Sequence, residues 1–163
     1  MVLSITNTTH FERRLGRRIA AAATVLSVVL FLTSLTQDGY YIDRPGDPRA
    51  WAPCIGLLLI GWLGVFDGIL AWLANPALLA AWIFLNFRSS RRLGAAIGAA
   101  AIAFALSFLL YTEILTNEAG GTSKITGYGA GYWLWVASGG VAMIGGLAAW
   151  VSDWKSAAEG ASS

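Results

Sequence analysis

Apolar residues divide the chain into four hydrophobic stretches separated by polar ones. The longest covers residues 53–87 and contains one formal charge, at Asp67, before a basic cluster at 88–92. A helix needs about 20 apolar residues to cross the hydrocarbon core of a bilayer. This stretch of 35 residues is therefore long enough for one crossing and too short for two with a turn between them.

The long stretch must bend or lie partly outside the membrane. As one straight helix it would measure about 52 Å, whereas the hydrocarbon core is about 30 Å thick. Counting back from the basic cluster predicts a crossing at 66–87 and an interfacial or re-entrant helical segment at 53–65. A single tilted helix, kinked at Pro76, is the alternative, because proline removes a backbone donor and clashes one turn back.

The other apolar stretches predict three further crossings, at 19–35, 93–115 and 132–151. A charged leader before an apolar core is also typical of a signal peptide, but no small-x-small motif closes the first stretch, which favours a crossing. The segments 36–52 and 116–131 are polar and rich in glycine or proline, which predicts loops. We therefore predict a single all-α membrane domain: a four-helix transmembrane bundle with one extra segment, a short N-terminal region (1–18) and a tail (152–163).

Composition and charge agree with a membrane protein. Hydrophobic residues make up 56% of the chain and charged residues only 12%, about half the charged share of an average soluble domain. Eight Lys and Arg residues flank the predicted inner ends and three lie in the two predicted outer loops. The positive-inside rule therefore predicts that both termini are cytoplasmic. A bacterial inner membrane is the predicted location, since no eukaryotic-style targeting segment is recognised.

Several kinds of chemistry are disfavoured by residue counts. One cysteine rules out an internal disulfide, and one histidine makes a His/Cys metal cluster or bis-histidine haem site implausible. The net charge of +2 does not predict nucleic-acid binding. No catalytic set, metal site or cofactor motif is recognised, so we predict a protein without enzymatic activity or cofactor.

Asp67 is the most informative single residue, because a carboxylate within an apolar stretch is costly unless it is protonated, paired or hydrated. One hypothesis makes it a proton or cation site. The other places it at the outer elbow as the N-cap of the crossing helix, where the helix dipole favours its charge.

Asn75 and Pro76 form a second candidate site. An Asn-Pro pair within a membrane helix frees backbone carbonyls and adds an amide, and transporters use such breaks to bind ions or substrates. An interhelical hydrogen bond from Asn75 beside a structural kink is the alternative. Glu113 lies at the predicted outer end of the third crossing and is a candidate partner for either site.

Small residues and aromatic residues suggest contact surfaces. Gly64 with Gly68, and Gly94 with Gly98, form GxxxG pairs that allow close approach of helices. Aromatic residues gather near the predicted outer ends, as in the segment 128–135, where they form an interface belt or line a site for a lipid, quinone or pigment.

Taken together, these features predict a non-catalytic accessory, scaffold or assembly subunit of a membrane protein complex. Its predicted partners are the lipid bilayer and either other membrane subunits or further copies of itself. The alternative is a small oligomeric transporter or channel that uses Asp67 and the Asn75-Pro76 break.

Overall fold

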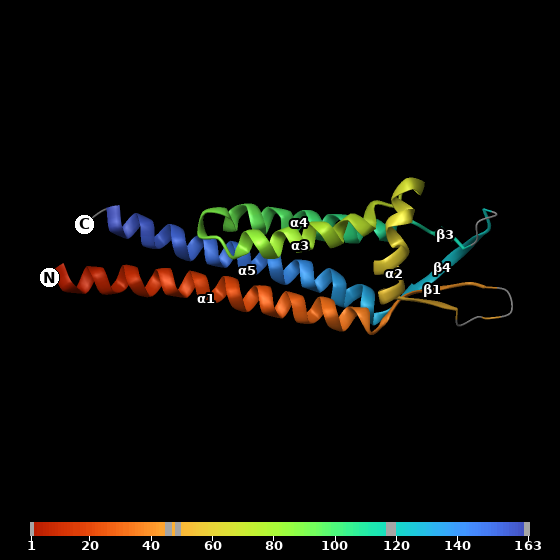
Figure 1. Ribbon diagram of the computed structural model, residues 1–163, viewed down its shortest axis with the longest axis horizontal. Coiled ribbons are helices and arrows are strands. Elements are labelled where there is room, and N and C mark those ends of the chain that lie inside the picture. The colour runs from red at the N-terminus through yellow and green to blue at the C-terminus, as the bar shows by residue number, and fades with distance from the viewer. Residues whose placement is uncertain (1, 45–46, 48–49, 117–119, 162–163) are drawn as a thin grey trace.

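The computed structural model describes residues 2–44, 47, 50–116 and 120–161. The helices are α1 (Val2–Leu35), α2 (Cys54–Ile60), α3 (Ala74–Leu85), α4 (Arg91–Ser107) and α5 (Ala130–Ala161) (Figure 1). Four short 3₁₀ segments accompany them: η1 (Gly61–Asp67), η2 (Leu70–Leu73), η3 (Arg88–Ser90) and η4 (Phe108–Leu110). The strands are β1 (Asp38–Ile42), β2 (Trp51–Pro53), β3 (Glu113–Leu115) and β4 (Thr122–Tyr128).

Three helical stretches in the described residues are long and apolar enough to cross a membrane: Arg14–Leu35, Arg88–Leu110 and Ala130–Ala158. They overlap three of the four crossings predicted from the sequence, at 19–35, 93–115 and 132–151. The remaining predicted crossing corresponds to the shorter apolar stretch Leu70–Leu85. This stretch consists of η2 followed directly by α3.

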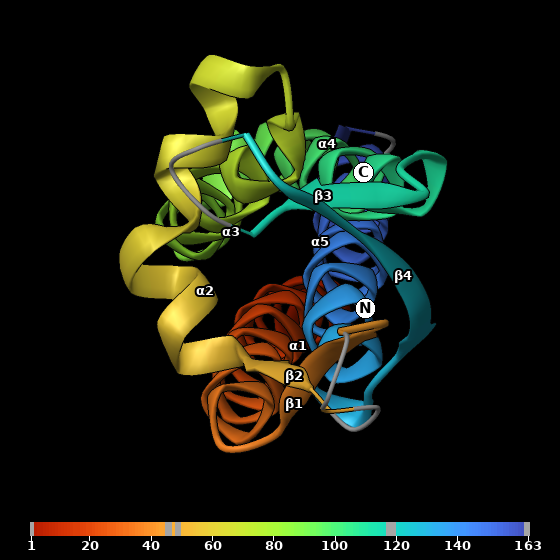
Figure 2. The ribbon, with the colours of Figure 1, turned by 90° about the vertical axis from the view of Figure 1, so that its right-hand side faces the viewer.

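α1, α3, α4 and α5 run side by side along the long axis of the molecule (Figure 1). α1 packs along α5, and α4 packs against both α5 and α3. Both termini lie at one end, which we call the basic end, and the strands lie at the other, the sheet end. Viewed from the sheet end, α2 crosses from the end of α1 toward α3 (Figure 2).

The prediction that 36–52 and 116–131 are only loops, and hence that the fold is all-α, is wrong. Together with residues 113–115 of the predicted third crossing, these segments form an antiparallel sheet of four strands in the order β2-β1-β4-β3. Tyr40 pairs with both Ala52 and Tyr128, and Leu115 pairs with Thr122. Aromatic and β-branched residues favour a pleated, half-buried surface, but each hairpin alone is too short to be stable in water. Pairing between the two loops makes the sheet.

The predicted third crossing at 93–115 also ends too late. The helical stretch stops at Leu110, Tyr111 is extended, and Glu113–Leu115 becomes strand β3. The apolar residues Ile114 and Leu115 were counted with the crossing because hydrophobicity alone does not distinguish a short buried strand from the end of a helix.

An ion pair closes the bundle at the basic end. The buried Arg91 guanidinium of α4 donates a hydrogen bond to the Asp153 carboxylate of α5. Gly16 of α1 lies against this pair: a Cβ built at Gly16 would come within 2.8 Å of Asp153 Oδ1 and 3.0 Å of Arg91 Nη1. These three residues, the basic clamp, hold α1, α4 and α5 together.

A hydrogen-bonded bridge joins α3 to α1 and α5 in the middle of the bundle. Trp82 Nε1 donates to Ser27 Oγ at 2.8 Å, and Ser27 Oγ donates to the Ser138 carbonyl at 2.7 Å. The Phe31 and Trp82 rings meet edge to face, 5.6 Å between centroids. Ser27 and Ser138 are fully buried, so this bridge connects the helices where few other α1–α3 contacts occur.

Candidate binding chamber at the sheet end

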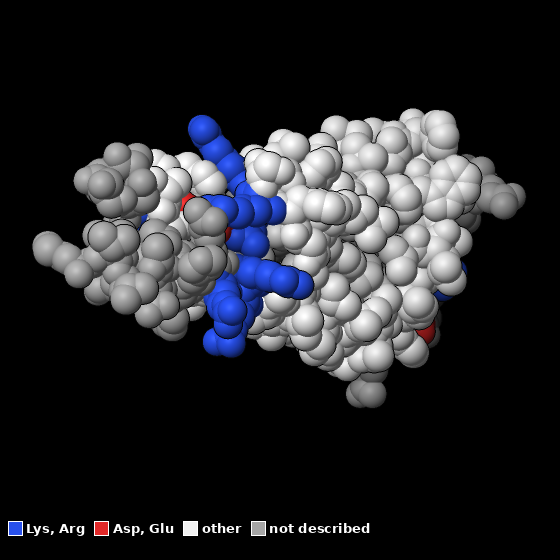
Figure 3. Space-filling model, turned by 60° about the vertical axis from the view of Figure 1, so that its left-hand side comes forward, with Lys and Arg blue, Asp and Glu red and all other residues white. Residues whose placement is uncertain are grey.

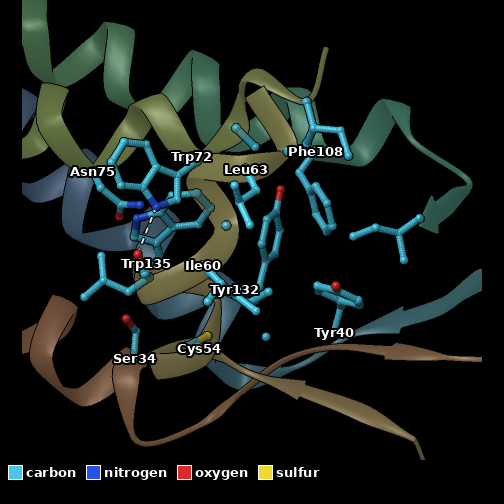
Figure 4. Close-up of a pocket in the computed structure, with 18 of the residues that line it drawn as sticks. Ser34, Tyr40, Cys54, Ile60, Leu63, Trp72, Asn75, Phe108, Tyr132 and Trp135 are labelled. Atoms are coloured by element: carbon cyan, nitrogen blue, oxygen red, sulfur yellow. Dashed lines mark hydrogen bonds between the residues drawn. The ribbon is translucent and has the colours of Figure 1, made fainter. Parts of the chain in front are cut away.

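A cavity of about 310 Å³ lies among the ends of the helices near the sheet (Figure 4). We call it the sheet-end chamber. Its volume is at the lower end of the range of small-molecule sites, about 300–1,000 Å³. Residues from α1, β1, α2, η1, η2, α3, β3 and α5, with Phe108 of η4, line it: Phe31, Ser34, Leu35, Gly39, Tyr40, Cys54, Leu57, Leu58, Ile60, Gly61, Leu63, Gly64, Asp67, Ile69, Ala71, Trp72, Asn75, Phe108, Ile114, Leu115, Tyr132 and Trp135.

An aromatic cluster forms one wall of the chamber. The Phe108 ring contacts Tyr40, Tyr128 and Tyr132 at centroid distances of 5.2, 6.0 and 6.1 Å. The Tyr132 hydroxyl donates a hydrogen bond to the Ala105 carbonyl at 3.0 Å, which ties α5 to α4. This wall is held by both ring packing and a buried hydrogen bond, so it is a rigid surface.

The segment α2–η1 forms the opposite wall and is attached at two points. Trp72 Nε1 donates to the Leu58 carbonyl at 3.0 Å, and the Tyr111 hydroxyl donates to the Gly68 carbonyl at 2.7 Å. Gly68 has φ of 83°, a left-handed conformation that glycine adopts without steric cost. The chain therefore turns sharply there, which sends η2 and α3 back along the bundle.

The opening of the chamber is apolar. Ile60, Leu63 and Leu115 all line it and are nevertheless 63%, 51% and 45% exposed. On the same segment Phe66 is 81% exposed. A chamber whose rim consists mostly of exposed apolar side chains, with Asp67 as its charged member, is suited to contact with hydrocarbon along most of its edge.

The chamber does not extend along the bundle to the basic end. Its deepest lining residues are Phe31 of α1, Asn75 of α3 and Trp135 of α5. Beyond Phe31, the Trp82–Ser27 bridge occupies the space between α1 and α3. The chamber is therefore a blind recess that opens near the sheet end.

Asp67 is the last residue of η1 and is exposed. The prediction that it caps the following helix is wrong, because the next helical segment is preceded by Ile69 and has no side-chain cap. Gly68 turns the chain between them. Asp67 nevertheless lines the chamber, at its opening.

Asn75 and Pro76 lie in the first turn of α3. Proline is tolerated there because the amide hydrogens of the first turn have no partner within the helix, so the predicted kink at Pro76 is absent and the chain instead changes from 3₁₀ to α-helix at Ala74. The Asn75 side chain makes no hydrogen bond to another residue in the described part of the chain, and it lines the chamber.

Glu113 lies outside the chamber. Its backbone pairs with that of Lys124 in the ladder between β3 and β4. Its exposed carboxylate accepts a hydrogen bond from the Thr122 hydroxyl at 2.9 Å. The structure therefore brings Asp67 and Asn75 to one cavity and leaves Glu113 on the sheet.

Of the two glycine pairs predicted to pack against other helices, one lies on a helix face and the other does not. A Cβ at Gly94 would approach the Leu85 amide nitrogen to 2.9 Å, and one at Gly98 would approach the Met143 nitrogen to 3.0 Å. These two glycines therefore face α3 and α5 of the same chain. Gly64 and Gly68 lie in η1 and in the turn that ends it, where they form no helix face.

Sequence reasoning did not assign Tyr40 and Cys54 to a site. Burial raises the pKa of the Tyr40 hydroxyl to about 12. Burial, followed by the nearby Asp38 charge, raises the pKa of the Cys54 thiol to about 11. Both groups are therefore neutral near pH 7, and the Cys54 thiol is a poor nucleophile.

The described residues contain no group of three or more His, Cys, Asp and Glu side chains that could hold a metal ion. A scan against protein-family models and searches of curated proteins and of solved structures found no match. The geometry of the chamber is therefore what indicates a function.

Proposed function

We propose that this chain is a non-catalytic, four-crossing membrane protein that binds one hydrocarbon chain of a lipid in its sheet-end chamber. One observation carries this proposal: the chamber is lined mostly by apolar side chains, and exposed apolar side chains such as Ile60 and Leu63 form its rim together with the Asp67 carboxylate. The volume of about 310 Å³ is suited to a single chain rather than a whole lipid.

The fourth crossing in this proposal is the stretch Leu70–Leu85. The four 3₁₀ residues of η2 and the twelve α-helical residues of α3 together extend about 26 Å, close to the thickness of a bilayer core. α3 also packs along α4, which is one of the three longer apolar helices. In this arrangement the chamber lies in the leaflet nearest the sheet.

Substituting neighbouring residues of α2 tests the proposal. Leu58 lines the chamber, whereas Leu59 does not and is 66% exposed. Each is replaced by tryptophan, and the protein is exposed in bilayers to phosphatidylcholine that carries a photoreactive diazirine on one acyl chain. We expect cross-links to chamber residues in the natural protein and in Leu59→Trp, and a loss of these cross-links in Leu58→Trp.

Native mass spectrometry of the same variants in mild detergent provides a second measurement. The natural protein and Leu59→Trp should retain one more phospholipid than Leu58→Trp, while all three unfold at similar temperatures. Equal retention and equal cross-linking in the two variants would overturn the proposal, as would cross-links confined to the outward faces of the helices.

A small proton or cation transporter is the second candidate, because Asp67 and Asn75 line the same chamber. Its test is proton flux into liposomes that contain a pH-sensitive dye. If the protein transports protons, Asp67→Asn should abolish the flux and Glu113→Gln, a carboxylate outside the chamber, should not. No flux above that of empty liposomes is the result expected for a lipid-binding protein.

The accessory-subunit role is kept as the wider proposal, because a lipid-binding chain without catalytic chemistry acts through another membrane protein. Purification of the tagged chain in native membrane discs, with mass spectrometry of co-purifying proteins, should find a second membrane protein in fixed ratio. Recovery of this chain alone would contradict an accessory role without affecting the lipid-binding proposal.

We further propose a bacterial inner membrane location with both termini cytoplasmic, supported by the seven Lys and Arg residues between 14 and 18, 88 and 92, and at 155 at the basic end. In a Cys54→Ala background, a membrane-impermeant thiol reagent should label Thr126→Cys on intact cells. Ser89→Cys should be labelled only after the membrane is opened. Labelling of position 89 on intact cells would reverse the topology.

A further inference from the structure

The basic end carries a band of cationic side chains (Figure 3). The exposed members come from three separate parts of the sequence: Arg14, Arg17, Arg18, Arg88, Arg92 and Lys155. They lie on α1, on the turn before α4 with its first residues, and on α5. The fold therefore brings distant charges to one level along the bundle.

Among the described side chains, few members of the band form ion pairs. Among the described residues, Asp153 is the carboxylate that forms ion pairs at this end, and its partners are the buried Arg91 and, at 3.3 Å from Nε to Oδ1, Arg88. One carboxylate thus serves two guanidinium groups. The described ion pairs include none from the remaining exposed members of the band.

A shallow groove lies within the band, between the turn at 87–89 and α5. Arg88 and Asp153 line it together with the rings of Trp150 and Trp154. The Arg92 guanidinium lies over the Trp150 ring, 5.6 Å from its centroid. Tryptophan beside basic residues is typical of the headgroup layer at a bilayer surface.

We propose that the cationic band binds the phosphate headgroups of anionic phospholipids, with Arg88 and Arg92 contacting phosphate at this groove. The charges come from α1, from the start of α4 with the turn before it, and from α5, so the band spans several helices at one level (Figure 3). A layer of lipid headgroups meets all of these helices at that level. The band also lies where Arg14–Leu35, Arg88–Leu110 and Ala130–Ala158 begin or end as apolar helices, and phosphates are the anions present at that level.

The experiment compares lipids retained from vesicles made of equal amounts of phosphatidylglycerol and phosphatidylcholine. Native mass spectrometry gives the ratio of the two lipids bound to the protein. We expect the natural protein to be enriched in phosphatidylglycerol. In the double variant Arg88→Gln/Arg92→Gln, the ratio of bound phosphatidylglycerol to phosphatidylcholine should decrease by about fivefold for each charge removed. Arg44→Gln, an exposed cation near the sheet, is the matched control and should leave the ratio unchanged.

A second variant protects against loss of folding, because Arg88 also contacts Asp153. Arg14→Gln with Arg17→Gln removes two charges that have no described ion pair, and it should lower the enrichment in the same way. Raising the salt concentration should weaken the enrichment as well. Inorganic phosphate is added in a separate arm: its failure to displace the lipid identifies the lipid headgroup as the ligand, and full displacement identifies a free phosphate site instead.

The proposal is overturned if both double variants keep the enrichment of the natural protein, or if Arg44→Gln reduces it equally. This outcome does not depend on the chamber, because Leu58→Trp should change chain cross-linking without changing the ratio of anionic to zwitterionic lipid. Failure of one proposal therefore leaves the other intact.

Discussion

The two ends of this bundle are closed by different means. At the basic end, one buried ion pair between Arg91 and Asp153 packs against Gly16 and holds three helices in direct contact. At the sheet end, aromatic rings pack around Phe108, and a chamber remains between these rings and the α2–η1 segment. The glycine at position 16 allows close approach of helices at one end, whereas a space is left beside the large rings at the other.

This difference indicates where the molecule tolerates change. A buried ion pair is sensitive to the loss of either partner, because the remaining charge stays buried without compensation. An aromatic wall distributes its stabilisation over many contacts, each small. Substitutions at the basic end should therefore affect stability, whereas substitutions at the sheet end should affect ligand binding more than stability.

The largest effect is expected from breaking the basic clamp. Asp153→Asn leaves the buried Arg91 charge unpaired and should lower the free energy of unfolding in detergent by about 3–5 kcal/mol. Arg91→Gln should cost less, because Arg88 still pairs with the Asp153 carboxylate at 3.3 Å. Arg92→Gln, on an exposed neighbour of the same helix, should change it by less than about 0.5 kcal/mol. A double-mutant cycle over Arg91 and Asp153 that finds additive effects would show that the pair does not act as a unit.

A smaller effect is expected at the glycine that packs on the clamp. Gly16→Ala places a methyl group 3.2 Å from the Ala149 carbonyl oxygen and closer still to the ion pair, and overpacking of this kind costs about 1–3 kcal/mol. Gly140→Ala meets nothing within 4 Å and should stabilise α5 by up to about 1 kcal/mol. Thermal unfolding of the two variants should therefore shift in opposite directions, and a shift in the same direction would contradict close packing at Gly16.

The sheet end should respond more weakly to the loss of a single polar contact. Tyr132→Phe removes the hydrogen bond to the Ala105 carbonyl while keeping the ring, so it should cost about 0.5–1.5 kcal/mol in unfolding free energy. Tyr41→Phe, an exposed ring whose hydroxyl lies 3.4 Å from Asp38, is the control and should be nearly neutral. A cost at Tyr132 as large as that of breaking the clamp would remove the contrast between the two ends.

The smallest effect is expected at Asp67. Because this exposed residue does not cap a helix, Asp67→Asn and Asp67→Ala should both change the free energy of unfolding by less than about 0.5 kcal/mol. An N-cap would instead lose about 1 kcal/mol in the alanine variant alone. A clear difference between the two variants would therefore restore the capping hypothesis that the turn at Gly68 contradicts.

Hydrophobic patterning alone determined the long helices. The apolar stretches at 19–35, 93–115 and 132–151 overlap the helical segments Arg14–Leu35, Arg88–Leu110 and Ala130–Ala158. They are visible in the sequence because a helix in hydrocarbon satisfies its backbone polar groups internally. The basic residues at the ends of these stretches can also be read locally from the sequence, and they mark one end of the bundle. A bend within residues 53–87 was also predictable, because a straight helix of 35 residues is longer than the hydrocarbon core of a bilayer is thick.

The sheet, the clamp and the chamber were decided only by tertiary structure. The strands that contain Tyr40 and Tyr128 lie in segments whose glycine, proline and polar residues predict loops. They become stable by pairing across these two distant segments. In the sequence, Asp153 belongs to a polar tail. Only the fold brings it against Arg91, which is 62 positions away. Asp67 and Asn75 came to one cavity through the turn at Gly68. Long-range pairing and the shape of a cavity depend on how elements pack, and local sequence patterns do not contain that information.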